Sequence, residues 1–204
     1  MSFDILDTLI LRRCSPHDVF SIAEEKYNAK HGEFLSTFRQ DRVEAEHRAR
    51  STSTREDITL GEIYCELADI YGTDKAGELR AMEIRAEFEA VYPNEELREF
   101  YGLVRELSRR IVITSDMYLP SSIVAEMLRM CGYEGYEKLY VSSDFGLSKR
   151  RGGLFRFMLW ENGVKPSEVI HIGDNLLSDY LVPKRFGMSG FLYRGGLSEN
   201  RHGI

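Results

Sequence analysis

The second half of the chain alternates between short apolar segments and longer amphipathic ones. The apolar segments are RIVITS at 110–115, KLYVSS at 138–143, EVIHIGD at 168–174 and SGFLYR at 189–194. Apolar runs of this length, separated by helical patterns, predict parallel strands joined by crossover helices. With SFDIL at 2–6 as the first strand, the sequence predicts an α/β fold, a Rossmann-like doubly wound parallel sheet.

The segment 16–108 has a different character, because it is charged, follows helical periodicity and contains no strand-like run. Thr59 and Glu62 have the spacing of a capping box at the start of one helix. We therefore expect four or five helices inserted after the first strand. The predicted boundaries are 1–13 and 107–204 for the α/β core and 14–106 for an inserted α-helical cap.

Composition limits the partners of such a protein. The chain has 204 residues, 43% of them hydrophobic, with a formal net charge of −6. It therefore lacks the basic field that would attract nucleic acid, and no apolar run approaches the roughly 18 residues of a membrane-spanning helix. The three widely spaced cysteines, interpreted as buried free thiols, favour a reducing compartment. We expect a cytoplasmic protein with a small-molecule partner. The chain begins just before its first predicted strand and ends soon after its last, which favours a domain of a longer protein.

Polar residues follow the predicted strands at the edge of the sheet where ligands bind in such folds. These residues are Asp4, Thr8, Ser115, Asp116, Lys149, Asp174 and Asp179. We expect three acids, a hydroxyl and a lysine to converge on one crevice.

Phosphoryl transfer is the chemistry that this set favours. Asp4 and Asp174 would share a Mg²⁺, which prefers carboxylate and carbonyl oxygens. Lys149 would neutralise charge on the phosphoryl oxygens, and the Ser115 hydroxyl would position them. Asp4 would attack phosphorus and give an aspartyl-phosphate that water hydrolyses. We assign Asp179 to the metal site, where it would orient Lys149 or a metal-bound water.

Four motifs in this order resemble those of the haloacid dehalogenase-like (HAD) hydrolases. They are FDILDTL at 3–9, IVITSD at 111–116, GLSKRRGGLF at 146–155 and GDNLLSD at 173–179. The resemblance covers the whole chain, and it implies a Mg²⁺-dependent hydrolase with a helical cap and with Asp4 as the nucleophile. The FDxxDTLxxR opening, SDMYLP and HIGDN resemble a subgroup often fused to glycosyltransferase modules in bacterial surface-polysaccharide loci. That likeness implies a domain of, or a partner to, a glycosyltransferase.

The chain departs from the family pattern at Leu6. The resemblance implies an aspartate here that protonates the leaving oxygen and then activates water, and leucine can do neither. The backbone carbonyl of Leu6 can still coordinate Mg²⁺, as the family implies. Asp7 is one replacement for the acid, but strand alternation directs positions 6 and 7 to opposite sides, so this role needs a backbone turn there. His17 or a cap side chain is another, and a substrate with a good leaving group would remove the need for one.

Three functions remain open after this departure. The first is a phosphatase-type hydrolase acting on a small phosphomonoester such as a sugar phosphate. General acid–base help is worth about 10²–10⁴-fold, so its loss slows attack without abolishing it. The second is a catalytically impaired binding or scaffold domain, and the third is a 2-haloacid dehalogenase, because relatives that break carbon–halogen bonds also lack this acid. Retention of Asp174 and Asp179 argues against the third.

The remaining residues are assigned as follows. Arg12 follows the first motif and is a candidate for an anionic group of the substrate. His171 lies inside a predicted strand and is expected to be a core histidine, and Trp160 is expected to pack a helix against the sheet. The predicted catalytic residues are Asp4, Lys149 and Asp7; the substrate-binding residues are Thr8, Ser115, Asp116, Lys149 and Arg12; the metal ligands are Asp4, Leu6, Asp174 and Asp179.

Overall fold

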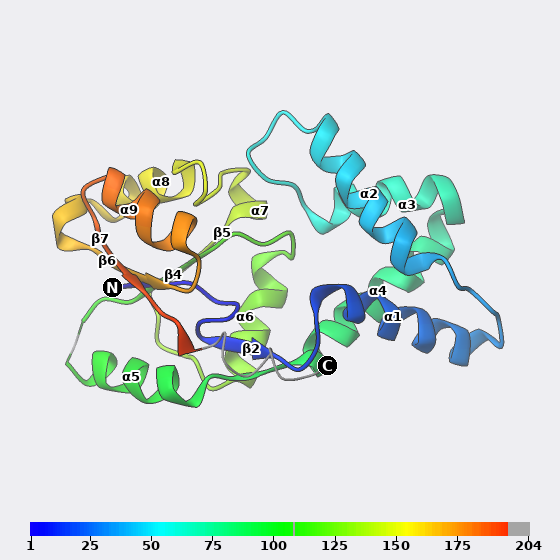
Figure 1. Ribbon diagram of the computed structural model, residues 1–204, viewed down its shortest axis with the longest axis horizontal. Helices are drawn as coiled ribbons and strands as arrows, with labels where there is room; N and C mark the ends of the chain where they lie inside the picture. The colour runs from blue at the N-terminus through cyan, green and yellow to red at the C-terminus, as the bar shows by residue number, and fades with distance from the viewer. Residues whose placement is uncertain (108, 196–204) are drawn as a thin grey trace.

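A parallel sheet of five strands forms the centre of the structure, which is a computed structural model that describes residues 1–107 and 109–195 (Figure 1). The strand order is β5-β4-β1-β6-β7. The strands are β1 (Ser2–Phe3), β4 (Val112–Ser115), β5 (Lys138–Val141), β6 (Ile170–Gly173) and β7 (Ser189–Leu192). Phe3 pairs with Ile113 on one side and with Ile172 on the other, so β1 is the central strand. The predicted α/β, Rossmann-like sheet is confirmed.

Helices cover both faces of this sheet, because alternate residues of each strand point to opposite sides. On β4, Val112 packs with apolar residues of α8 (Gly153–Asn162) and α9 (Val182–Arg185). The next residue, Ile113, packs with those of α5 (Glu95–Glu106) and α6 (Ser121–Met130). Figure 1 shows α8 and α9 on one side of the strands and α5 and α6 on the other. The short elements between strands are α7 (Ser142–Phe145), a 3-10 helix (Pro166–Glu168) and a π-helix (Leu176–Leu181).

Four further helices lie at the other end of the molecule (Figure 1). They are α1 (Pro16–His31), α2 (Phe38–Thr52), α3 (Leu60–Tyr71) and α4 (Thr73–Ala90). The Thr59 side chain accepts from the Glu62 amide and the Glu62 side chain from the Thr59 amide, which confirms the predicted capping box at α3. No helix within residues 1–107 and 109–195 is long and apolar enough to cross a membrane.

These four helices meet the α/β part through a two-stranded ribbon and through hydrogen bonds of the loop between α2 and α3. Strands β2 (Ile10–Arg12) and β3 (Val91–Pro93) pair antiparallel, so the chain leaves and re-enters the α/β part as a two-stranded ribbon. On the opposite side, the loop between α2 and α3 contacts the segment after β5. There, the Arg55 guanidinium donates to the Ser143 carbonyl at 2.6 Å, and the Glu56 carboxylate accepts from the Ser148 amide at 2.8 Å.

Helix α5 packs with the sheet, whereas the sequence analysis places it in the inserted cap, which it ends at residue 106. The ring of Phe3 in β1 lies 5.6 Å from that of Tyr101, and the Tyr101 hydroxyl donates to the Glu134 carbonyl. The chain has therefore returned from the inserted helices at β3. The sequence did not indicate this boundary, because the exposed face of α5 is as charged as those of the inserted helices. Only the buried face of α5, which packs with the sheet, distinguishes it from them.

Two expectations about single residues were wrong. Trp160 is 75% exposed, and its ring lies 5.9 Å from that of Phe157 of the same helix, in a tilted arrangement, instead of packing against the sheet. Among the free cysteines, Cys131 is buried but Cys65 is exposed and Cys14 lies between these classes. A hydrophobic residue on a helix is not obliged to face the core, since much of a protein surface is apolar.

Candidate active site

The chain turns sharply after β1 and brings Asp4 to the end of the central strand. The Asp4 amide donates to the Ile172 carbonyl at 2.8 Å, which extends the pairing with β6. The Ile10 amide then donates to the Ile5 carbonyl at 2.9 Å and closes a tight loop. Within the loop Asp7 has a φ of +54°, a left-handed conformation that Asp tolerates better than most residues. The turn that the sequence analysis requires for Asp7 is present.

Lys149 and Ser115 both contact the Asp4 carboxylate. The Lys149 ammonium lies 2.5 Å from Asp4 Oδ1, and the Ser115 hydroxyl donates to the same oxygen at 2.9 Å. All three side chains are almost fully buried. They come from the ends of β1 and β4 and from the loop before α8, so the predicted convergence of these residues is present in the structure.

A second carboxylate, Asp179, holds Lys149 from the other side. Its Oδ1 lies 2.7 Å from the Lys149 ammonium, and its Oδ2 accepts from the Asn175 amide at 2.9 Å. His171 Nε2 lies 3.2 Å from Asp179 Oδ1, and His171 Nδ1 lies 2.8 Å from the Ser2 hydroxyl. The Asn175 amide fixes one oxygen of Asp179, so the other oxygen is held in a defined position against the Lys149 ammonium and orients it. His171 is a buried, hydrogen-bonded residue, as expected, but it also supports Asp179 from below.

The electrostatics of the cluster show more negative charge than Lys149 can neutralise. Burial acts to lower the pKa of Lys149, but the carboxylates of Asp179 and Asp4 outweigh it and raise that pKa, so the lysine stays charged. Burial, together with the negative charges of Asp4 and Asp179, raises the pKa of Asp174 to about 7. A carboxyl group that resists ionisation among other carboxylates marks a place where a further cation would be stabilised.

The donor atoms fit a hard divalent cation. Asp4, Asp174 and Asp179 each offer a carboxylate oxygen, and these oxygens lie within 4.8 Å of one another. Oxygen ligands of this kind, supplemented by waters, are what Mg²⁺ takes in proteins. Asp179 is already engaged by Lys149 and Asn175, so Asp4 and Asp174 are the better placed ligands.

Thr8 and Asp116 have structural partners that the sequence did not predict. The Thr8 hydroxyl approaches Asp174 Oδ1 at 3.5 Å, and the Thr8 carbonyl accepts from the Asn94 side chain at 2.7 Å. Asp116 Oδ1 accepts from the Lys149 amide at 2.6 Å, and its Oδ2 accepts from the Arg150 amide at 3.2 Å. Asp116 therefore fixes the loop that carries Lys149.

Arg12 is buried between β2 and the inserted helices. One of its terminal nitrogens lies 2.9 Å and 3.1 Å from the two carboxylate oxygens of Glu87 in α4. Its Nε is buried and has no hydrogen-bond partner among the described residues. Arg12 therefore forms an ion pair with Glu87 through one terminal nitrogen, while its Nε–H donor has no acceptor among the described residues.

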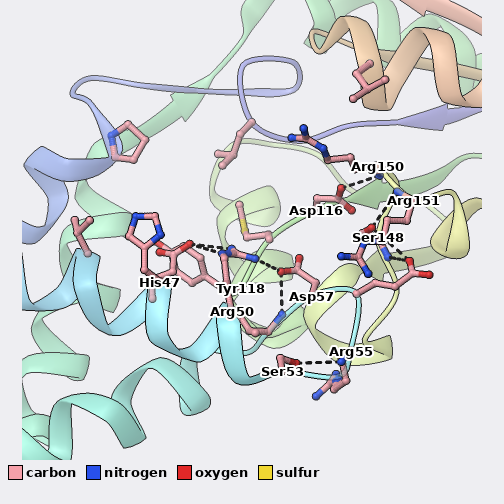
Figure 2. Close-up of a pocket in the computed structure, with 18 of the residues that line it drawn as sticks. His47, Arg50, Ser53, Arg55, Asp57, Asp116, Tyr118, Ser148, Arg150 and Arg151 are labelled. Atoms are coloured by element: carbon pink, nitrogen blue, oxygen red, sulfur yellow. Dashed lines mark hydrogen bonds and ion pairs between the residues drawn. The ribbon is translucent and has the colours of Figure 1, made fainter.

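A cleft of about 960 Å³ opens between the inserted helices and the α/β part. Leu6 and Asp116 line it, so it adjoins the Asp4 cluster, and the position that carries an acid in the related hydrolases presents an apolar side chain to it. Figure 2 shows Arg150 and Arg151 on the α/β side of the cleft, with His47 and Arg50 across it on α2. His17, the alternative proton donor, and Arg12 also line the cleft.

Most of this cleft wall was not predicted from the sequence. Arg150, Arg151 and Arg185 were assigned no role, although the first two lie in the basic run SKRR at 148–151. The run of basic residues was the available signal, but such a run more often marks a solvated face. The support that Ser2 gives to His171 left no signal in the sequence, because it depends on the register of β1 against β6.

Two comparisons of the sequence with known proteins found partial matches. A family model described as HAD-hydrolase-like matches residues 147–203. A curated relative, haloacid dehalogenase-like hydrolase domain-containing protein 3 of Xenopus laevis, is 32% identical over 96 residues, which are 47% of this chain. The match spans 38% of the length of that relative.

Solved structures support the fold. A 2-haloacid dehalogenase from Pseudomonas syringae superposes with a TM-score of 0.73 and 15% identity, covering 94% of this chain and 84% of that chain. A HAD family enzyme from Bacteroides thetaiotaomicron, in complex with magnesium and inorganic phosphate, has a TM-score of 0.62 and 15% identity and covers 96% of this chain and 93% of that chain. The chain therefore has the fold of these HAD-like proteins, and its residues 147–203 are similar to the HAD-hydrolase-like family.

Proposed function

We propose that this protein is a Mg²⁺-dependent phosphatase-type hydrolase that acts on a small phosphomonoester, such as a sugar phosphate, through Asp4. The observation that carries the proposal is the pair of contacts at Asp4 Oδ1, where the Lys149 ammonium lies at 2.5 Å and the Ser115 hydroxyl at 2.9 Å. A buried carboxylate next to a fixed cation and a hydroxyl donor suits attack on a phosphoryl group whose oxygens those two groups hold.

The reaction would proceed in two displacements. An Asp4 oxygen forms a bond to phosphorus while the bond to the leaving-group oxygen breaks and that oxygen takes a proton. Water then attacks phosphorus of the aspartyl-phosphate, which releases inorganic phosphate and restores the carboxylate. Lys149, held by Asp179, faces the negative charge that spreads over the phosphoryl oxygens in both steps.

Asp4, Asp174 and the Leu6 carbonyl are the groups we assign to the metal. When bound, Mg²⁺ supplies positive charge to the phosphoryl oxygens and lowers the repulsion between an anionic nucleophile and an anionic substrate.

Asp7 is the residue we assign as proton donor. Burial raises the pKa of Asp7, so its carboxyl group holds a proton better than an ordinary aspartate does. The positive φ at Asp7 takes its side chain out of strand alternation, which removes the geometric objection to this role. A group with a raised pKa near an anionic site suits proton donation to a leaving oxygen.

The test is phosphate release from a panel of sugar phosphates and nucleotides, with Mg²⁺ and with EDTA. We expect turnover that needs the metal and that Asp4→Asn abolishes. Asp18→Asn is the matched control, since Asp18 is a capping residue of α1 that pairs with Arg39 and takes no part in the Asp4 cluster. Unaltered activity in Asp4→Asn would refute the mechanism.

A non-catalytic binding or scaffold domain, within or beside a cytoplasmic glycosyltransferase, is the second candidate. The observation that favours it is that Leu6, not an acid, faces the cleft. This function predicts no turnover by the wild type, and it predicts that Asp4→Asn leaves any assembly with the transferase intact. A 2-haloacid dehalogenase would instead release halide from 2-haloacids without Mg²⁺, with Asp4 forming an ester at carbon that water cleaves.

A further inference from the structure

The cleft beside the Asp4 cluster is lined by more basic than acidic side chains. Six arginines line it against four carboxylates, and His17 and His47 add to the basic side. The arginines are Arg12, Arg50, Arg55, Arg150, Arg151 and Arg185, and the acids are Glu46, Glu56, Asp57 and Asp116. This excess occurs in a chain whose formal net charge is −6.

The acids of the cleft are occupied by internal partners. Asp57 is bound by Arg50 and Ser142, and Glu56 by the Ser148 amide. Glu46 pairs with Arg42 and Arg50. Asp116 is filled by two backbone amides. The negative charge of these acids is therefore balanced within the protein. The arginines without an acidic partner remain available to a ligand in the cleft.

Three of the arginines have no such commitment. Within the described residues, the guanidinium groups of Arg150, Arg151 and Arg185 make no hydrogen bond or ion pair. Their backbone is nevertheless fixed. The Arg150 amide donates to Asp116, the Arg151 amide donates to the Ser148 hydroxyl at 3.1 Å, and the Gly152 amide closes the turn on the Lys149 carbonyl at 2.8 Å.

Close packing at Gly152 brings Phe186, next to Arg185, to the same turn. Gly152 has a φ of +83°, and a Cβ at this position would lie 2.1 Å from the ring of Phe186. Only glycine allows the loop and the ring to meet this closely. Arg185 precedes Phe186 and lines the same cleft as Arg150 and Arg151, so the three residues share one cavity wall.

Arg12 provides the buried part of the cation set. It is only 9% exposed, lines the same cleft, and keeps a buried Nε without a partner among the described residues. A buried N–H that finds no acceptor destabilises the folded protein. An acceptor oxygen of a ligand would remove that cost.

From this juxtaposition we infer that the substrate carries a second phosphate group, bound in the cleft by Arg150, Arg151, Arg185 and Arg12 while the first lies at Asp4. The inference rests on the proposed function and names its substrate class, a small bisphosphorylated molecule. A carboxylate offers two oxygens and one charge, whereas a phosphate offers three oxygens and about two charges, which suits several guanidinium donors better. A cleft of about 960 Å³ has room for such a molecule.

The test separates binding from turnover. Calorimetry on the Asp4→Asn protein with Mg²⁺ compares glucose 1,6-bisphosphate with glucose 6-phosphate, which differ by one phosphate. We expect the bisphosphate to bind at least about tenfold more tightly, with a preference that shrinks as ionic strength rises, because three of the arginines are exposed. Equal affinity for the two ligands, or no measurable binding of either, would overturn the inference.

Variants identify the groups responsible. Adding Arg150→Gln, Arg151→Gln and Arg185→Gln to Asp4→Asn should remove the bisphosphate preference and leave affinity for glucose 6-phosphate within about threefold. Arg109→Gln is the matched control, since Arg109 is exposed and lies outside the lining of the cleft, and it should keep the preference. An equal loss for both ligands in the triple variant would contradict the inference. Turnover of p-nitrophenyl phosphate by the wild type, which needs no second phosphate, tests the proposed function separately.

Discussion

Removal of the Lys149 charge should destabilise the protein strongly. The ammonium is the shared partner of Asp4 and Asp179, and the three side chains are 3%, 9% and 1% exposed, so water cannot replace it. Deleting one member of a buried ion pair typically costs about 3–5 kcal/mol, because the remaining charge stays buried. For a chain of this size that corresponds to a decrease in Tm of about 6–20 °C. We therefore expect Lys149→Met to lower the urea midpoint markedly in EDTA.

Mg²⁺ should reverse part of this loss. The metal would bring positive charge back to the same carboxylates, so it should raise the Tm of Lys149→Met by more degrees than that of the wild type. Lys165→Met, at an exposed position, is the matched control and should change stability by less than about 0.5 kcal/mol. An unchanged urea midpoint in Lys149→Met, or equal stabilisation of both proteins by Mg²⁺, would refute the electrostatic reasoning.

Three further predictions concern single carboxyl groups of the site. Because the folded-state pKa of Asp174 is raised to about 7, stability in EDTA should fall as pH rises from 4 to 7, and Asp174→Asn should flatten that slope in urea titrations. Asp7→Asn should slow hydrolysis of alkyl phosphates by about 10²-fold or more but spare p-nitrophenyl phosphate, whose leaving group needs no proton; equal losses would exclude Asp7 as the acid. Leu6→Asp should increase phosphate release from alkyl phosphates while Leu6→Asn does not, and silence from both would point to a site that lacks more than its proton donor.

The sheet and the position of the site could be predicted from the sequence. Short apolar strands place their carboxyl ends at one edge, so Asp4, Ser115 and Asp174 were expected there before their distances were known. The turn at Asp7 could be stated only as a requirement, because the φ of one residue depends on the hydrogen bonds that Ile5 and Ile10 make around it.

The parts that could not be predicted depend on which face of an element is buried. Helix α5 looks like its charged neighbours until Tyr101 meets Phe3. Trp160 is apolar but faces outward. The role of Asp116 in fixing the Lys149 loop rests on two backbone amides, and the packing of Phe186 against that loop rests on one close contact at Gly152. Hydrophobic periodicity does not predict these contacts, because they join segments that lie far apart in the sequence.

The central position of β1 also determines when the site can form during synthesis. Ser2 pairs with Val112 on one side and with His171 on the other, so β1 has no neighbouring strand until about a hundred residues more have been synthesised. Pairing across such separations is slow, and the exposed strand is prone to wrong partners meanwhile. The inserted helices, whose contacts are local, can fold during that wait. Asp4, the proposed nucleophile, is therefore synthesised long before the strands β4 and β6 that pair beside it.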